Sequence, residues 1–122
     1  MHIVYRPSLQ EAPPSALTIG NFDGVHVGHA AVLRNLVALA KERGLVPTVV
    51  TFAPNPKAYF AQLRGVPLPT QIMPLRDKVA ALKRLGIEQV VILPFDAKLA
   101  NMPAEAFVQT VLNERLNTQL LM

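Results

Sequence analysis

The chain has 122 residues, which is enough for one domain with a single hydrophobic core. Hydrophobic residues make up 51% of it, yet no apolar run approaches the roughly 18 residues that cross a bilayer, so we expect no membrane segment. There is no cysteine, which excludes a disulfide scaffold and a thiolate metal site and fits a reducing compartment. We therefore expect a cytoplasmic protein.

The charge is modest and dispersed. The formal net charge is +4, and the twelve Lys and Arg residues are scattered along the chain without a block of like charge. A nucleic-acid surface is typically a clustered basic stripe interleaved with aromatic residues, and two Tyr and five Phe form no such pattern here. We predict no nucleic-acid partner and a mild preference for small anionic ligands.

Strand and helix patterns alternate from residue 17 onward. A short apolar strand is predicted over 17–22, followed by a helix over 27–43 that ends at Gly44. A second strand covers 45–52. Residues 53–74 hold five of the eleven prolines and are predicted to be irregular, and a connection of this length indicates a functional loop.

The alternation continues to the end of the chain. A helix is predicted over 75–85, a strand over 87–95 and a helix over 104–116, and residues 118–122 resemble the first part of a fourth strand. This order predicts an α/β fold, a Rossmann-like doubly wound parallel sheet that is truncated at its fourth strand. Ligands of such sheets bind beyond the carboxyl ends of the strands.

Two histidines follow the first predicted strand, in the segment GNFDGVHVGH. If the helix begins near His26, then His26 and His29 share one face close to its N-terminus, where free N–H groups favour an anion. Gly28 leaves no side chain between them, and Gly20 and Gly24 allow a ligand close to the preceding turn. The pattern predicts a phosphate-binding corner with two imidazole donors.

The chemistry that needs such a corner is nucleotidyl transfer, because donors fixed in advance stabilise the charge that builds on the α-phosphate. Two alternatives remain open. The histidines could be part of a metal site, with Asp23 as the one near candidate for a third ligand, or they could be surface residues without a role. The strand end, the glycine-rich turn and the helix start together favour the phosphate site, and we predict no metal ligands.

GNFDGVHVGH also resembles the motif of the FMN adenylyltransferase (FAD synthetase) module of bacterial bifunctional riboflavin kinase/FMN adenylyltransferases, which belong to the H-x-G-H nucleotidylyltransferase superfamily. The segments TFAPNP, LRDKVAALKRLGIEQVVILPFD and LANMPAEAFVQTVLNERL resemble the segments that follow in that family. H-x-G-H alone is shared with other transferases, whereas the flanking residues and the T-F-x-P segment favour this family.

The resemblance implies an enzyme that transfers AMP from ATP to FMN, giving FAD and pyrophosphate, with Mg²⁺ accompanying ATP. It implies that His26 and His29 bind the ATP phosphates and stabilise the transition state. It further implies that the nucleotide pocket is shaped by six residues: Gly20, Asn21, Phe22, Asp23, Gly24 and Gly28.

The resemblance also places Phe52, Pro54, Asn55 and Pro56 on the flavin side. The residues alone favour a rigid loop with one core aromatic for Phe52, Pro54 and Pro56. Asn55 stands where the family usually has histidine. Asparagine can donate and accept a hydrogen bond, but it cannot carry a charge or stack as an imidazole does.

Two later family segments that help to hold ATP, G-x-x-F-x-F-G and S-S-T-x-I-R, do not occur here, and neither does a riboflavin kinase domain. We therefore expect residues 1–122 to be a single FMN adenylyltransferase-like domain that is incomplete at its C-terminus, belongs to a longer protein and is a poor enzyme alone. The alternatives are another H-x-G-H adenylyl- or cytidylyltransferase and a non-catalytic nucleotide-binding fragment.

Overall fold

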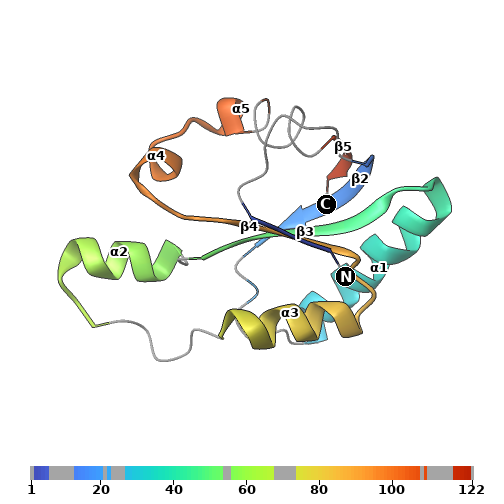
Figure 1. Cartoon of the computed structure of the whole chain (residues 1–122), viewed down its shortest axis with the longest axis horizontal. Coiled ribbons are helices and arrows are strands. Elements are labelled where there is room, and N and C mark those ends of the chain that lie inside the picture. Colours follow the sequence, from blue (N-terminus) through green and yellow to red (C-terminus); the bar gives the residue numbers. More distant parts are fainter. Residues whose placement is uncertain are drawn as a thin grey trace.

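Five parallel strands form one sheet at the centre of the molecule (Figure 1). The structure is a computed structural model that describes residues 2–5, 13–20, 22, 27–53, 56–67, 74–107, 109 and 117–121. The strand order is β1-β4-β3-β2-β5, and every neighbouring pair is parallel. The strands are β1 (His2–Tyr5), β2 (Ser15–Ile19), β3 (Val46–Phe52), β4 (Gln89–Leu93) and β5 (Thr118–Leu121).

Helices lie on both sides of this sheet. They are α1 (Val27–Arg43), α2 (Pro56–Arg64), α3 (Leu75–Arg84), α4 (Ala97–Ala100) and α5 (Ala104–Phe107). Figure 1 shows α1 and α3 on one side and α4 and α5 on the other, while α2 extends away from the carboxyl end of β3. The predicted doubly wound α/β fold is therefore confirmed. In the described ranges, no helix is both long and apolar enough to cross a lipid bilayer.

Two elements were not predicted. β1 is an edge strand that pairs with β4 from His2↔Gln89 to Tyr5↔Ile92, so the sheet has five strands rather than three and the start of a fourth. The segment predicted to be irregular, 53–74, contains the nine-residue helix α2, so that prediction was wrong. α2 begins at Pro56, where the missing N–H of proline costs nothing because the first helical N–H has no partner in the helix.

Other boundaries shift for local reasons. β2 ends at Ile19 rather than at residue 22, because Phe22 has a left-handed backbone (φ 53) that a strand cannot accommodate. α1 has the predicted bounds, and Gly44 follows it at φ 68, as a glycine C-cap does. Of the helix predicted over 104–116, the structure describes α5 and residue 109.

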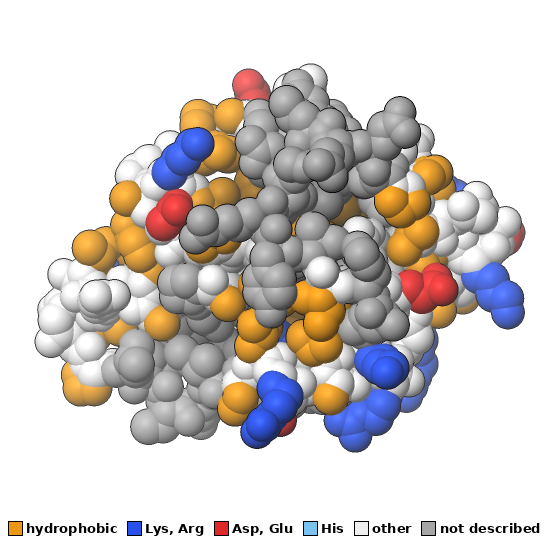
Figure 2. Space-filling model, viewed as in Figure 1, with side chains coloured by type: hydrophobic (Ala, Val, Ile, Leu, Met, Phe, Trp, Pro, Cys, Tyr) orange, Lys and Arg blue, Asp and Glu red, His pale blue; other side chains and the backbone are white. Residues whose placement is uncertain are grey.

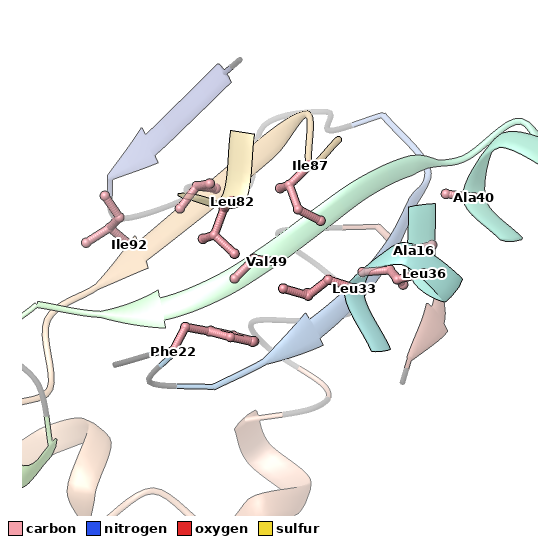
Figure 3. Close-up of a cluster of buried hydrophobic side chains, with 10 residues drawn as sticks. Ala16, Phe22, Leu33, Leu36, Ala40, Val49, Leu82, Ile87 and Ile92 are labelled. Carbon is pink, nitrogen blue, oxygen red and sulfur yellow. The ribbon is translucent and has the colours of Figure 1, made fainter. Parts of the chain in front are cut away.

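The core forms two layers because successive residues of β2, β3 and β4 point to opposite faces of the sheet. One layer, under α1 and α3, includes Ala16, Leu33, Val49, Leu82 and Val90, and Figure 3 shows part of it. The other layer contains Leu17, Val50, Val91 and Leu93, with Leu99 and Phe107 packed against it. Burial on both faces explains why these strands are apolar without alternation.

Candidate active site

The carboxyl ends of β2 and β5 mark the point where the chain changes direction across the sheet. β2 lies between β3 and β5, and α1 and α5 lie on opposite sides of the sheet. In open α/β sheets, such a switch point is the place where ligands bind. Gly20 and Phe22, two of the predicted nucleotide residues, directly follow β2, so the topology brings them to this position.

The N-terminus of α1 is the first feature at this edge. α1 is 17 residues long, begins at Val27 and has no acidic residue in its first turn. Gly28 and His29 are its second and third residues. Free N–H groups and the helix dipole favour an anion there. His26, Asn21, Asp23 and Gly24 lie outside the residues that the structure describes.

Two residues between β2 and α1, Gly20 and Phe22, are described, and each is held by a contact with the sheet or the core. The Gly20 N–H donates to the Val50 carbonyl over 3.0 Å, which continues the pairing of β2 with β3. Two residues later, the Phe22 side chain is only 8% exposed and lies in the core layer under α1 and α3. Phe22 was predicted to shape the nucleotide pocket, and the structure shows that its ring packs inward against the core.

A second feature lies at the carboxyl ends of β3 and β4. Phe52 ends β3, and its ring meets that of Phe95 edge-to-face at a centroid distance of 5.6 Å. Tyr59 and Phe60 of α2 lie 5.4 and 5.7 Å from the same Phe95 ring. Phe52 is thus part of an aromatic cluster, defined as Phe52, Tyr59, Phe60 and Phe95.

Of the other residues predicted for the flavin side, Pro56 is the first residue of α2, and Pro54 and Asn55 lie outside the described residues. Tyr59, Phe60 and Phe95 were not predicted as site residues. Tyr59 and Phe60 closely follow the T-F-x-P segment, and Phe95 comes just after β4. Because carboxyl ends of adjacent parallel strands meet at one edge, that placement is the signal that could have grouped them.

One ring of the aromatic cluster is partly exposed. Phe60 is 41% exposed, and the guanidinium carbon of Arg64 lies 6.0 Å from its ring centroid. Leu63 and Val66, which follow Phe60 along the chain, are also exposed hydrophobic residues. A planar aromatic molecule that carries an anionic group suits such a surface, since the rings provide stacking and the arginine provides charge.

A buried lysine lies on the α1 side of the sheet. Lys78 in α3 is 2% exposed, whereas Figure 2 shows other Lys and Arg side chains standing outward over α3. Lysines on an amphipathic helix are expected to face solvent, so the sequence pattern did not single out this one.

In the part of the chain that is described, no three His, Cys, Asp or Glu side chains group to hold a metal ion.

Comparison with known proteins decides the family. The sequence model of the FAD synthetase family matches residues 8–122. The chain belongs to the FAD synthetase family. It is 40% identical over 106 residues to a bifunctional riboflavin kinase/FMN adenylyltransferase of Haemophilus influenzae, covering 87% of this chain and 33% of the relative. Identity to the protein of the same name from Escherichia coli K12 is 35% over 116 residues, covering 93% and 36%.

The chain thus spans about a third of the length of these FAD synthetase relatives. Among solved structures, it superposes with a TM-score of 0.81 on the crystal structure of a macrolide-efflux protein from Streptococcus pneumoniae, at 24% identity, over 99% of this chain and 41% of that one. At this identity, the superposition supports the fold alone, and it agrees with the doubly wound sheet described above.

Proposed function

We propose that this chain carries an FMN adenylyltransferase activity, which transfers the AMP group of ATP to FMN. An FMN phosphate oxygen attacks the α-phosphorus of ATP, the bond from that phosphorus to the α,β-bridging oxygen breaks, and FAD and pyrophosphate form. The observation that carries the proposal is the start of α1 directly beyond β2, at the switch point of the sheet, in a member of the FAD synthetase family.

On the nucleotide side, His26 and His29 donate to the ATP phosphates and stabilise the charge of the transition state, together with the first N–H groups of α1. The nucleotide pocket is shaped by the segment that contains Gly20, Asn21, Phe22, Asp23, Gly24 and Gly28. Mg²⁺ enters with the triphosphate of ATP as part of the substrate. No covalent intermediate is needed, because positioning and electrostatic stabilisation provide the catalysis.

On the flavin side, the isoalloxazine ring lies against the aromatic cluster, next to the segment that contains Pro54, Asn55 and Pro56. Support comes from the exposed ring of Phe60 and from the Arg64 guanidinium near it. β2 and β3 are paired neighbours, and adjacent strands lie about 5 Å apart, so the start of α1 and the start of α2 follow adjacent strand ends. The two substrates can therefore meet across one strand spacing.

The proposal includes residues 1–122 as a single adenylyltransferase-like domain acting in the cytoplasm. The test uses the product of the native reading frame with ATP, FMN and Mg²⁺, and FAD is separated and quantified by its fluorescence. A parallel assay offers CTP with choline phosphate. Formation of FAD supports the proposal. Turnover of the second pair alone, or of neither pair, contradicts it.

A further inference from the structure

Phe22 combines two features that rarely occur together in an aromatic residue. Its backbone is left-handed (φ 53), a conformation in which bulky residues are outliers. Its side chain is nevertheless buried, in the same core layer as Leu33 of α1 and Val49 of β3. Figure 3 shows the ring directed back from the end of β2 toward Leu33. Strained residues of this kind persist where the surrounding packing holds them in place.

Gly20 provides the space that this ring occupies. A Cβ atom built on Gly20 would lie 2.8 Å from Cε2, 3.0 Å from Cζ and 3.3 Å from Cδ2 of Phe22. The described glycines with a positive φ are Gly44, Gly65 and Gly86, so Gly20 is not required for its backbone conformation. What demands a glycine at this position is the contact with the Phe22 ring.

We propose that Phe22 is a positioning residue, whose ring packs on Gly20 and against the core and thereby fixes the turn that carries the chain into α1. The ring lies in one core layer with residues of β2, β3 and α1, and the hydrogen bond from Gly20 to Val50 fixes the start of the connection. Gly20 then has a role through Phe22 that is distinct from its place in the backbone of the nucleotide pocket. The inference rests on the proposed function only for its kinetic readout.

A double-mutant cycle in the native protein separates these two roles of Gly20. The variants are Gly20→Ala, Phe22→Leu and the double substitution, and leucine lacks the ring atoms Cε2 and Cζ that an added Cβ would meet most closely. We expect Gly20→Ala to lower kcat about 100-fold, the scale of an ångström-sized misplacement, with a smaller change in KM for ATP. Made on the Phe22→Leu background, the same change should cost less than about threefold. An equal loss in both backgrounds would overturn the proposal.

Gly44→Ala is the matched control. Gly44 has φ 68 with no atom within 4 Å of an added Cβ, and it follows the far end of α1. Backbone strain there should lower Tm and leave kcat unchanged. If Gly20→Ala behaves in the same way, with a lower Tm and an unchanged kcat, its contact with Phe22 is merely structural and the proposal fails.

Backbone amide resonances of Gly28 and His29 provide a test that does not depend on turnover. We expect Gly20→Ala to shift them in the wild-type background and to leave them nearly unchanged on the Phe22→Leu background. If the protein makes no FAD while the resonances follow this pattern, the proposed function fails and the positioning role stands. If it makes FAD while Gly20→Ala leaves these amides unmoved, the positioning role is overturned.

Discussion

Two strand-to-helix turns at the same edge of the sheet use aromatic residues in opposite ways. After β2, the Gly20 N–H donates to the Val50 carbonyl over 3.0 Å, and after β3, the Ala53 N–H donates to the Leu93 carbonyl over the same distance. The backbone anchors are therefore equivalent. Yet Phe22 in the first turn is 8% exposed, whereas Phe60, in the helix after the second turn, is 41% exposed.

We infer from this difference that the two rings have different roles: the Phe22 ring holds the nearby backbone in place, whereas the Phe60 ring forms part of a surface that a ligand can contact. A ring turned into the core contributes burial energy and rigidity, so it places the backbone that follows it. A ring left half-open keeps a face free for another flat molecule. Substitution of the buried ring should consequently change mainly the free energy of unfolding, and substitution of the exposed ring should change mainly the affinity for FMN.

The largest effect is expected at the histidines. His26→Ala or His29→Ala should lower FAD formation about 10²- to 10³-fold, the cost of losing one preorganised donor to a transition-state anion. Tm should change little in either variant. The third histidine, His2 in β1, is the matched control, and His2→Ala should leave the rate unchanged. Near-normal rates for both single variants would exclude the proposed mechanism.

The next effect concerns stability at the inward ring. Phe22→Ala should lower the free energy of unfolding by about 3 kcal/mol, the low end for a buried phenylalanine, because part of the loss is recovered as the strained backbone relaxes. Urea unfolding of Phe22→Ala and Phe60→Ala side by side measures it. Phe60→Ala should cost about 1 kcal/mol or less, since much of its ring is already in water. Equal losses would remove the distinction between the two turns.

The outward ring should instead affect flavin affinity. We expect Phe60→Ala to weaken FMN binding about tenfold and ATP binding hardly at all, because a stacking partner is worth roughly 0.5–1.5 kcal/mol. Isothermal titration with each ligand measures the split. Leu63→Ala, an exposed apolar residue of the same helix outside the aromatic cluster, is the control and should change FMN binding less. If ATP weakens as much as FMN, the flavin does not lie on this cluster.

The smallest effect is expected at the two prolines where β3 leads into α2. Replacing Pro54 or Pro56 with Gly should weaken FMN by about 1 kcal/mol and ATP by less, because binding must then remove the freedom that glycine adds. Titration of both ligands, with Pro67→Gly beyond α2 as control, measures the difference. If the affinities for FMN and ATP fall equally, these prolines have a structural role only and do not contribute to the flavin side.

Local patterns were enough for much of the fold and for the residue types of the candidate site. The bounds of α1 were predictable because apolar spacing and a following glycine are properties of neighbouring residues. The H-x-G-H segment predicts an anion site from neighbouring residues too, since its glycines and histidines lie within a few residues of a strand end, and that site stays a prediction. β1 was missed because four residues carry little pattern, and only its pairing with β4 makes them a strand.

What the tertiary structure decided is which way the aromatic side chains point. The place of Phe22 in the motif predicts a pocket residue. The structure shows that its side chain is buried in the core layer that also contains Leu33 and Val49, which come from elements further along the chain. The aromatic cluster likewise needs β3, α2 and the end of β4 to meet before Phe95 can touch Phe52. Whether a side chain is buried depends on which distant segments pack against it, and this is set by how the parallel strands align their carboxyl ends. The spacing of residues along the chain does not specify that alignment.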